Sequence, residues 1–62
     1  MAGFNTLFEM SRDQKKGIMV YFDGQSLGGV VTAINTNSIE MRNQEFEKIV
    51  LLLDSITAVA IS

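Results

Sequence analysis

The sequence predicts a mainly β fold, in which a short N-terminal helix precedes a five-stranded, strongly bent antiparallel sheet. From residue 17 onward, short runs rich in Val, Ile, Thr and aromatic residues alternate with Gly, Asn, Asp and Ser, which is typical of strands joined by turns. The chain has neither proline nor an internal repeat, so nothing marks a linker. With 62 residues, we expect one domain over 1–62, with the helix at 5–13 and the strands within 17–61.

The first segment, 5–13, has the features of a short amphipathic helix. Asn5 or Thr6 is a suitable N-cap, since its side chain can accept a bond from an otherwise unpaired backbone N–H. About nine residues form a marginal helix in isolation, so this helix must dock on the sheet. Its apolar side consists of Phe4, Leu7, Phe8 and Met10.

The next two strands are expected to form a hairpin around Asp23-Gly24. Ile18, Val20 and Phe22 alternate with Met19 and Tyr21, so the two sets point to opposite faces. Asp23 and Gly24 tolerate the positive φ of a type I′ turn. The second strand, about 25–35, carries Gly28-Gly29 in its middle, which indicates a sharp bend or a close backbone approach.

The last three strands differ in which faces are apolar. In the third, Ile39 and Met41 point inward and Glu40 and Arg42 outward. The fourth is expected over 46–53 and is apolar on both faces from Ile49 to Leu53. The fifth, 56–61, is expected to place Ile56 on one face and Val59 and Ile61 on the other. Apolar side chains on both faces of two terminal strands favour a seam between subunits.

Composition narrows the functional classes. Without Cys or His, the chain has no disulfide and no thiolate metal site, and no Ser lies in the nucleophile-elbow context of a hydrolase. We therefore expect no enzyme, no cofactor and no metal. The net charge of −2 disfavours a broad phosphate-binding surface, but Arg12, Lys15 and Lys16 form a local basic stretch. The longest apolar run is too short to span a membrane and no signal peptide is visible, so a cytoplasmic location without a membrane partner is expected.

The segment from Phe22 to Asn43 resembles the first motif of the Sm-like (LSm/Hfq-type) RNA-binding ring proteins. The motif's spaced apolar residues, Asp/Asn-Gly, Leu-x-Gly and final Asn are matched in order by Val20, Phe22, Asp23-Gly24, Leu27, Gly29, Val31, Ile34-Asn35, Ile39, Met41 and Asn43. The second motif departs from the family, because Leu53-Asp54-Ser55 stands where members carry a basic signature. The resemblance therefore breaks at the turn where the family's RNA chemistry is most concentrated.

The resemblance implies a small open SH3-like barrel of the Sm-like fold and a closed homo-oligomeric ring of roughly five to seven copies. It implies single-stranded RNA as ligand at the inner rim, with DNA not excluded; the alternative is a structural or protein-interaction ring without RNA. The expected seam residues are Ile49, Val50, Leu51, Leu52, Leu53, Ile56, Val59 and Ile61. The expected nucleic-acid contacts are Asn35, Asn37, Arg42, Asn43, Lys15 and Lys16.

Each of these polar residues also has a purely structural interpretation. The asparagines suit turns, because their side chains bond the local backbone and tolerate positive φ. Arg42 is a candidate cross-strand partner of Glu40, Glu45 or Glu47. The basic stretch near residue 15 can stabilise a helix C-terminus. The sequence leaves both interpretations open.

Overall fold

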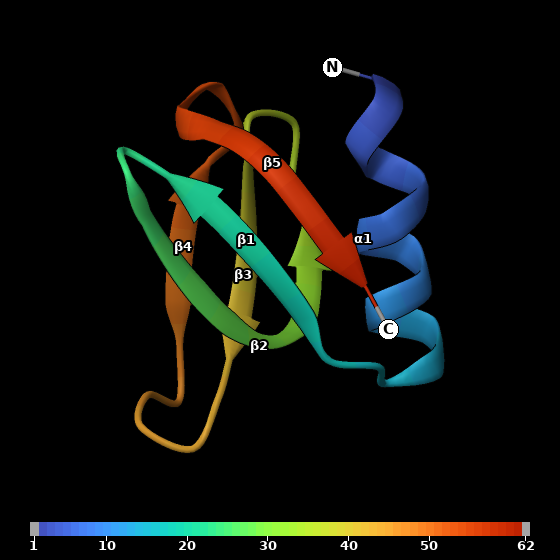
Figure 1. Ribbon diagram of the computed structural model, residues 1–62. Coiled ribbons are helices and arrows are strands. Elements are labelled where there is room, and N and C mark those ends of the chain that lie inside the picture. The colour runs from blue at the N-terminus through green and yellow to red at the C-terminus, as the bar shows by residue number, and fades with distance from the viewer. Residues whose placement is uncertain (1, 62) are drawn as a thin grey trace.

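The computed structural model describes residues 2–61 and confirms the expected fold class: one helix precedes a five-stranded antiparallel sheet (Figure 1). The elements are α1 (Ala2–Gln14), β1 (Ile18–Phe22), β2 (Gln25–Ile34), β3 (Ser38–Arg42), β4 (Ile49–Leu52), the 3-10 turn η1 (Leu53–Ser55) and β5 (Ile56–Ile61). The strand order is β4-β3-β2-β1-β5, so the sheet is not closed and β4 and β5 are its edges. This arrangement is consistent with a small SH3-like or Sm-like open barrel.

Strand β2 bends sharply and belongs to both halves of the sheet. Its first half pairs with β1, up to Gly29 opposite Ile18, and its second half pairs with β3, from Val30 opposite Arg42. A Cβ at Gly29 would lie 2.5 Å from the carbonyl oxygen of Arg42, closer than real contacts allow. The expectation of a close backbone approach at the glycine pair is therefore confirmed at Gly29.

The bend is held by a buried serine of the helix. The Ser11 side chain is fully buried; its hydroxyl donates to the carbonyl oxygen of Lys16 at 2.7 Å and accepts from the N–H of Val31 at 3.0 Å. The pairing of β2 with β3 shifts register between Val31 and Ala33. Ser11 thus ties the end of α1 to the place where β2 changes partner.

Helix α1 ends on a residue in left-handed conformation. Lys15 has φ 56°, and the N–H of Lys16 donates to the carbonyl oxygen of Ser11 at 3.1 Å. A positive φ followed by such a bond is the Schellman arrangement, which satisfies carbonyl groups at the helix end. The chain therefore turns directly from α1 into β1.

The expected helix start was wrong, because α1 already contains Ala2 to Phe4 and so carries Asn5 and Thr6 within it. Neither residue can then be the N-cap. Phe4 packs edge-on against Phe8 with ring centroids 6.2 Å apart, and both belong to the core contacts. Docking of these rings outweighs a local capping preference of about 1 kcal/mol.

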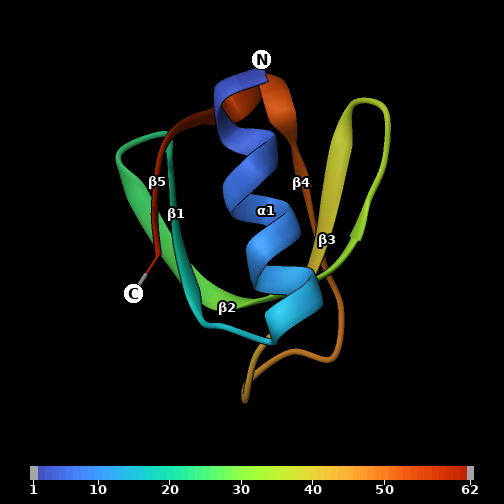
Figure 2. The ribbon, with the colours of Figure 1, turned by 90° about the vertical axis from the view of Figure 1, so that its right-hand side faces the viewer.

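The core lies between α1 and the concave side of the sheet. Figure 2 shows α1 across the open side, with β1 and β5 on one flank and β3 and β4 on the other. The inward positions expected for β1 and β3 are confirmed, because Ile18, Val20, Ile39 and Met41 are all buried. The complete buried cluster is Phe8, Ile18, Val20, Val31, Ile39, Met41, Leu51 and Ile56.

Strand β4 is shorter than expected. It begins at Ile49 rather than Phe46, and Leu53 belongs to η1. The cause is the side chain of Asn43, whose oxygen accepts the backbone N–H groups of Glu45 and Phe46, both at 2.9 Å. These bonds hold residues 43–46 in a loop, so β4 begins only at Ile49.

The faces expected for β5 were wrong. Ile56 is buried, and Val59 and Ile61 pack against the same core. The pairing of β1 with β5 shifts register between Tyr21 and Phe22, so that Phe22 faces Ile56 while Val20 faces Val59. This bulge inserts one extra residue and turns all three apolar side chains inward. Outward, β5 carries only small side chains.

Within residues 2–61, no helix combines the length and the apolar character needed to cross a membrane.

Ser11→Ala should lower the free energy of unfolding by about 1–3 kcal/mol, because it leaves the buried N–H of Val31 without a partner and removes the bond to the part-buried carbonyl of Lys16. Chemical denaturation of the two proteins measures this difference. Ser26→Ala is the matched control, since Ser26 is exposed on β2. Equal stability of the Ser11 and Ser26 variants would contradict the role given to this hydroxyl.

Candidate nucleic-acid interface

The turn between β2 and β3 contains two of the predicted contacts, Asn35 and Asn37. The N–H of Asn35 donates to the carbonyl oxygen of Ser38 at 2.8 Å, and its side-chain nitrogen reaches Ser38 Oγ and Glu40 Oε2 at 3.4 Å each. Asn37 accepts the N–H of Leu53 at 2.9 Å through its backbone carbonyl. Its exposed side chain makes no hydrogen bond within residues 2–61.

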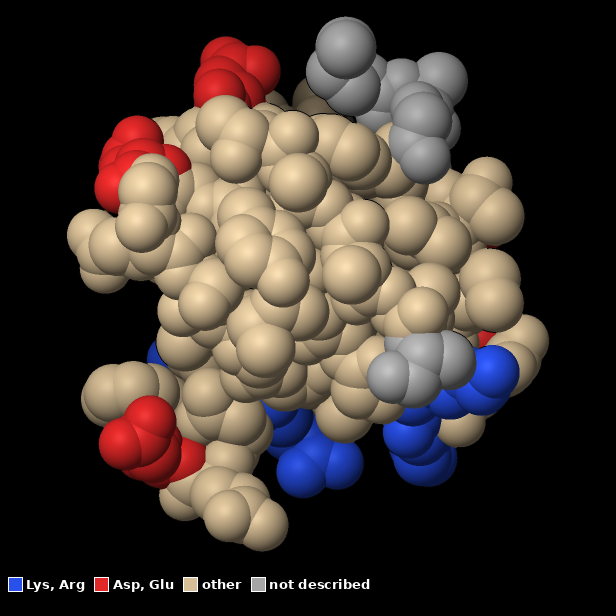
Figure 3. All heavy atoms as spheres, in the orientation of Figure 1, with Lys and Arg blue, Asp and Glu red and all other residues tan. Residues whose placement is uncertain are grey.

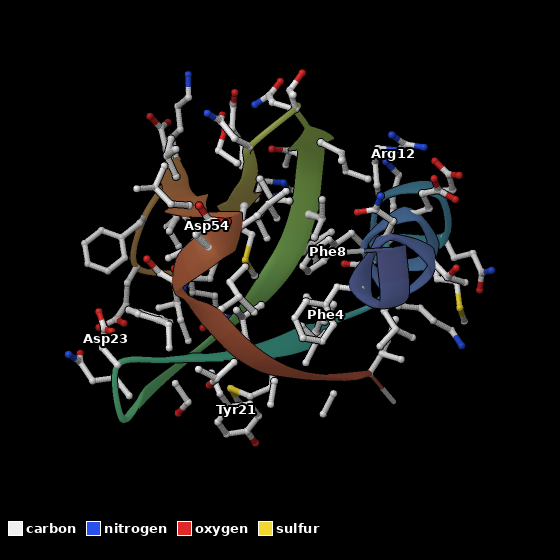
Figure 4. All side chains as sticks on the ribbon, turned by 90° about the horizontal axis from the view of Figure 1, so that it is seen from above. Phe4, Phe8, Arg12, Tyr21, Asp23 and Asp54 are labelled. Carbon is white, nitrogen blue, oxygen red and sulfur yellow. The ribbon has the colours of Figure 1, made fainter. Side chains whose placement is uncertain are left out.

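The bond from Leu53 places η1 against this turn, and η1 contributes an acid. Asp54 is exposed within η1 and is labelled in Figure 4. A carboxylate beside the turn repels phosphate, whereas the Asn37 amide can still bond the edge of a base. This end of the sheet therefore suits a base better than a phosphate.

Both polar atoms of the Asn43 side chain already form hydrogen bonds within the protein. Its nitrogen donates to the carbonyl oxygen of Gly28 at 2.9 Å, while its oxygen accepts the N–H groups of Glu45 and Phe46. These bonds join the β3–β4 loop to the bend of β2. Of the two interpretations left open by the sequence, the geometry at Asn43 fits the structural one.

The predicted contacts do not gather at one place. Asn35 and Asn37 precede β3, whereas Arg42 and Asn43 lie at its other end. From Asn37 to Asn43, six extended residue steps of about 3.3 Å separate the backbones by about 20 Å. A ligand at the asparagine turn therefore meets none of the basic side chains at the far end of β3.

Three basic residues gather instead beside the end of α1, and we name Arg12, Lys15 and Arg42 the basic cluster. They line a polar pocket of about 240 Å³ whose remaining walls are Val30, Val31 and Thr32 of β2. Figure 3 shows Lys and Arg side chains gathered along the lower edge of the molecule. Lys16 does not line this pocket but a second hollow on the other side of the bend.

Asp13 restrains one member of the basic cluster. Arg12 Nε donates to Asp13 Oδ1 at 2.8 Å, and Arg12 Nη2 lies 3.4 Å from Oδ2. The hydrogen bond and charge of Arg12 lower the pKa of the Asp13 carboxyl, and Asp13 raises that of the guanidinium. Asp13 thus stays ionised and offsets part of the positive charge that an anion would meet.

Arg42 is not bound to the acids that the sequence offered as partners. Among residues 2–61 the ion pairs are Arg12 with Asp13 and Lys48 with Glu40, the latter at 3.5 Å. The Arg42 side chain is exposed on the outer face of β3. Its guanidinium is therefore available to an anion at the pocket.

The predicted seam residues separate into two groups. Leu51 and Ile56 are buried in the core of their own subunit, and Ile49, Leu53, Val59 and Ile61 pack partly against it. Val50 and Leu52 point outward from β4 and remain 56% and 58% exposed. Only these two offer large, freely accessible apolar side chains on an edge strand.

The sequence grouped Arg12 with Lys15, but it did not predict that they meet Arg42, because only the bend of β2 brings the helix end to that residue. Within residues 2–61, no three carboxylates come together in a way that would hold a metal ion.

A scan against protein-family models finds none that matches this chain, and no curated protein matches its sequence.

Asn43→Ala should lower the free energy of unfolding by about 1–3 kcal/mol, since it removes the bond to the part-buried carbonyl of Gly28 and two bonds from exposed N–H groups. Asn37→Ala should change it by less than about 0.5 kcal/mol, because that side chain is exposed and unbonded. Parallel urea titrations compare the two variants. A neutral Asn43 variant would show that the loop does not depend on this amide.

Proposed function

We propose that the chain is a subunit of an Sm-like homo-oligomeric ring of roughly five to seven copies that binds single-stranded RNA. The observation that carries this proposal is the open sheet, whose edge strand β4 exposes Val50 and Leu52. The proposal places the ring in the cytoplasm, the location expected from the sequence.

The two edges of the sheet support assembly. Strands β4 and β5 each have one side without a partner strand, which leaves a row of backbone N–H and carbonyl groups to pair. Antiparallel pairing of β4 with β5 of a neighbour satisfies both rows. Because the two edges differ, the contact is head-to-tail and repeats until the subunits close a ring.

Side-chain size supports the same pairing. The outward residues of β4 are large, Val50 and Leu52, and those of β5 are small, Ala58 and Ala60. Side by side in one continuous sheet, the large residues of one subunit can lean over the small ones of the next. Val50 and Leu52 are 56% and 58% exposed, so burying the rest of each side chain at a seam supplies a driving force of about 1–1.7 kcal/mol each.

RNA binding is supported by the basic cluster and by the repetition of this cluster in every subunit of the proposed ring. One subunit offers three cations at a polar pocket, offset by Asp13, which alone is a weak phosphate site. A ring presents several identical sites at fixed spacing, so a single strand that touches many of them binds by avidity. The Asn37 side chain offers a separate contact for a base edge.

The second candidate function is a structural ring that holds a protein or no ligand. Asp54 beside the asparagine turn and the net charge of −2 favour it. The two candidates share the seam and differ only in whether nucleic acid is bound.

Replacing Val50 and Leu52 together by Lys should reduce the solution mass by roughly five- to seven-fold. The variant would have to bury two positive charges at every contact between subunits, so the ring should dissociate into single chains. Light scattering measures the mass, and circular dichroism checks that the subunit stays folded. Gln44→Lys, in the exposed β3–β4 loop, is the control and should leave the mass unchanged. A wild-type protein with the mass of one 6.8 kDa chain would overturn the proposed ring.

Arg42→Ala should weaken binding of short labelled U-rich or A-rich RNA by about tenfold and flatten its dependence on salt, by about 0.7 in log–log slope for each phosphate that is no longer neutralised. Asp13→Asn should strengthen binding, since it releases Arg12 and removes a negative charge. Fluorescence anisotropy at two salt concentrations measures both effects.

Lys48→Ala is the matched control, because it removes the same charge outside the basic cluster. If Arg42→Ala and Lys48→Ala weakened RNA binding equally, the effect would come from the loss of net positive charge and not from a specific contact at Arg42. A wild-type ring that binds neither RNA would favour the structural candidate.

A further inference from the structure

The loop between β3 and β4 carries an exposed aromatic side chain that neither the seam nor the basic cluster uses. Phe46 is 54% exposed and stands in the sequence between two acids, Glu45 and Glu47. Figure 1 shows this loop extending beyond the ends of the strands that it joins. A single exposed apolar side chain is common on protein surfaces, so its exposure alone assigns no contact.

The loop is fixed on both sides of Phe46. The N–H of Asn43 donates to the carbonyl oxygen of Phe46 at 3.0 Å, and the side-chain oxygen of Asn43 accepts the N–H of Phe46 at 2.9 Å. After Phe46, Lys48 pairs with Glu40 of β3 at 3.5 Å. A side chain on a fixed loop loses little conformational entropy when it is buried, so Phe46 is suited to enter a preformed pocket.

The charges around Phe46 indicate what it can contact. An exposed aromatic ring can stack on a base, but Glu45 and Glu47 would then lie near the phosphates and repel them. Gln44 and Glu45 line a hollow of their own subunit, whereas Phe46 and Glu47 do not. A partner for Phe46 and Glu47 should therefore combine an apolar pocket with a positive charge.

Each subunit has such a pocket where β1 begins and β5 ends. It is the hollow that Lys16 lines, with a volume of about 460 Å³, and we name it the β1–β5 hollow. Its wall consists of glycine backbone and of apolar side chains, among them Met19 and Ile61. Of the residues that the structure describes, Lys16 alone gives this hollow a charge. Its volume is typical of pockets that hold small ligands, so a phenyl side chain can enter it.

The proposed seam brings Phe46 of one subunit to the β1–β5 hollow of the next. Setting both large outward residues of β4 against both small ones of β5 places Val50 opposite Ala60 of the neighbour. Ile49 then lies opposite Ile61, because the strands are antiparallel. The loop before Ile49 therefore continues past the end of the neighbour's β5, where the hollow lies. Phe46 precedes Ile49 by three residues, at most about 10 Å of extended chain.

We infer that Phe46 of each subunit inserts into the β1–β5 hollow of the next subunit, and that Glu47 pairs there with Lys16. The inference rests on the proposed ring, because seam pairing is what brings the loop of one copy to the hollow of another. Backbone pairing of two strand edges depends little on which side chains the strands carry. The Phe46 contact therefore sets the register of β4 against β5 and favours copies of this chain over other strands.

A tryptophan reporter tests the insertion of the aromatic ring. The chain contains no tryptophan, so Phe46→Trp places a single indole at the site. In the ring, this indole should emit at short wavelength and be shielded from acrylamide. Adding Val50→Lys and Leu52→Lys, which separate the subunits, should shift the emission to longer wavelength and restore quenching. Light scattering on the same samples gives the mass, and circular dichroism reports whether each variant is folded.

A charge exchange tests the ion pair. Glu47→Lys should raise the concentration at which the ring dissociates by about tenfold, because it places two cations side by side at every seam. Lys16→Glu should have a similar effect, and the two changes together should restore assembly. Glu45→Lys is the matched control, since Glu45 lines a hollow of its own subunit, and Lys16→Glu should not compensate it. Sedimentation velocity over a range of concentrations measures dissociation.

The outcomes separate this inference from the proposed function. A wild type that sediments as single chains removes the ring and the Phe46 contact with it. An intact ring whose indole is as accessible as in the separated subunits overturns the insertion while the ring stands. A ring that the charge exchange does not restore overturns the pairing of Glu47 with Lys16. A Lys16→Glu ring that assembles normally but binds RNA more weakly would assign Lys16 to nucleic acid instead.

Discussion

The fold depends most on one buried hydroxyl, that of Ser11. Strand β2 must leave β1 and join β3 within a few residues, and at this change the N–H of Val31 bonds to a side chain rather than to a strand. Ser11 accepts that N–H while it donates to the carbonyl of Lys16 at the end of α1. Helix end, strand bend and the start of β1 are therefore fixed by one group, and Gly29 supplies the space that the bend requires.

The same bend determines what the molecule offers to its surroundings. Because β2 serves both halves of the sheet, the core closes around α1 while β4 and β5 remain as separate edges. The bend also brings Arg12 and Lys15 of the helix end to Arg42 of β3. A domain of about 60 residues buries only about 60% of its unfolded surface, and the unpaired edges with the exposed apolar side chains of β4 are the basis of the proposed ring.

Local patterns in the sequence predicted much of the fold. Alternation determined the faces of β1 and β3, and Asp23-Gly24 forms the expected turn with φ 49° and 72°. Two failures arose where a tertiary contact overrides a local preference: Phe4 packs against the core and so extends the helix, and the bulge beside Tyr21 turns β5 inward. The third is local, because the Asn43 side chain accepts the N–H groups of Glu45 and Phe46 and thereby shortens β4.

The candidate site was harder to predict for the same reason. Asn37, Arg42 and Asn43 lie close in sequence, yet the length of β3 separates the first from the other two, and the Asn43 amide is bonded within its own loop and to the bend of β2. The residue types indicated which side chains could contact nucleic acid, but the bend of β2 determines which of these side chains lie close together. Lys15 and Arg42 meet, and Arg12 joins them from the helix.

Amide hydrogen exchange across β4 and β5 tests the central claim, that both edges pair with neighbouring subunits. In an isolated antiparallel edge strand, alternate N–H groups point away from the sheet and exchange fast. Ring pairing predicts slow exchange for consecutive amides throughout Ile49–Leu52 and Ile56–Ile61. An alternating pattern, with only the amides directed toward β3 or β1 protected, would show that the edges stay free and would contradict the ring.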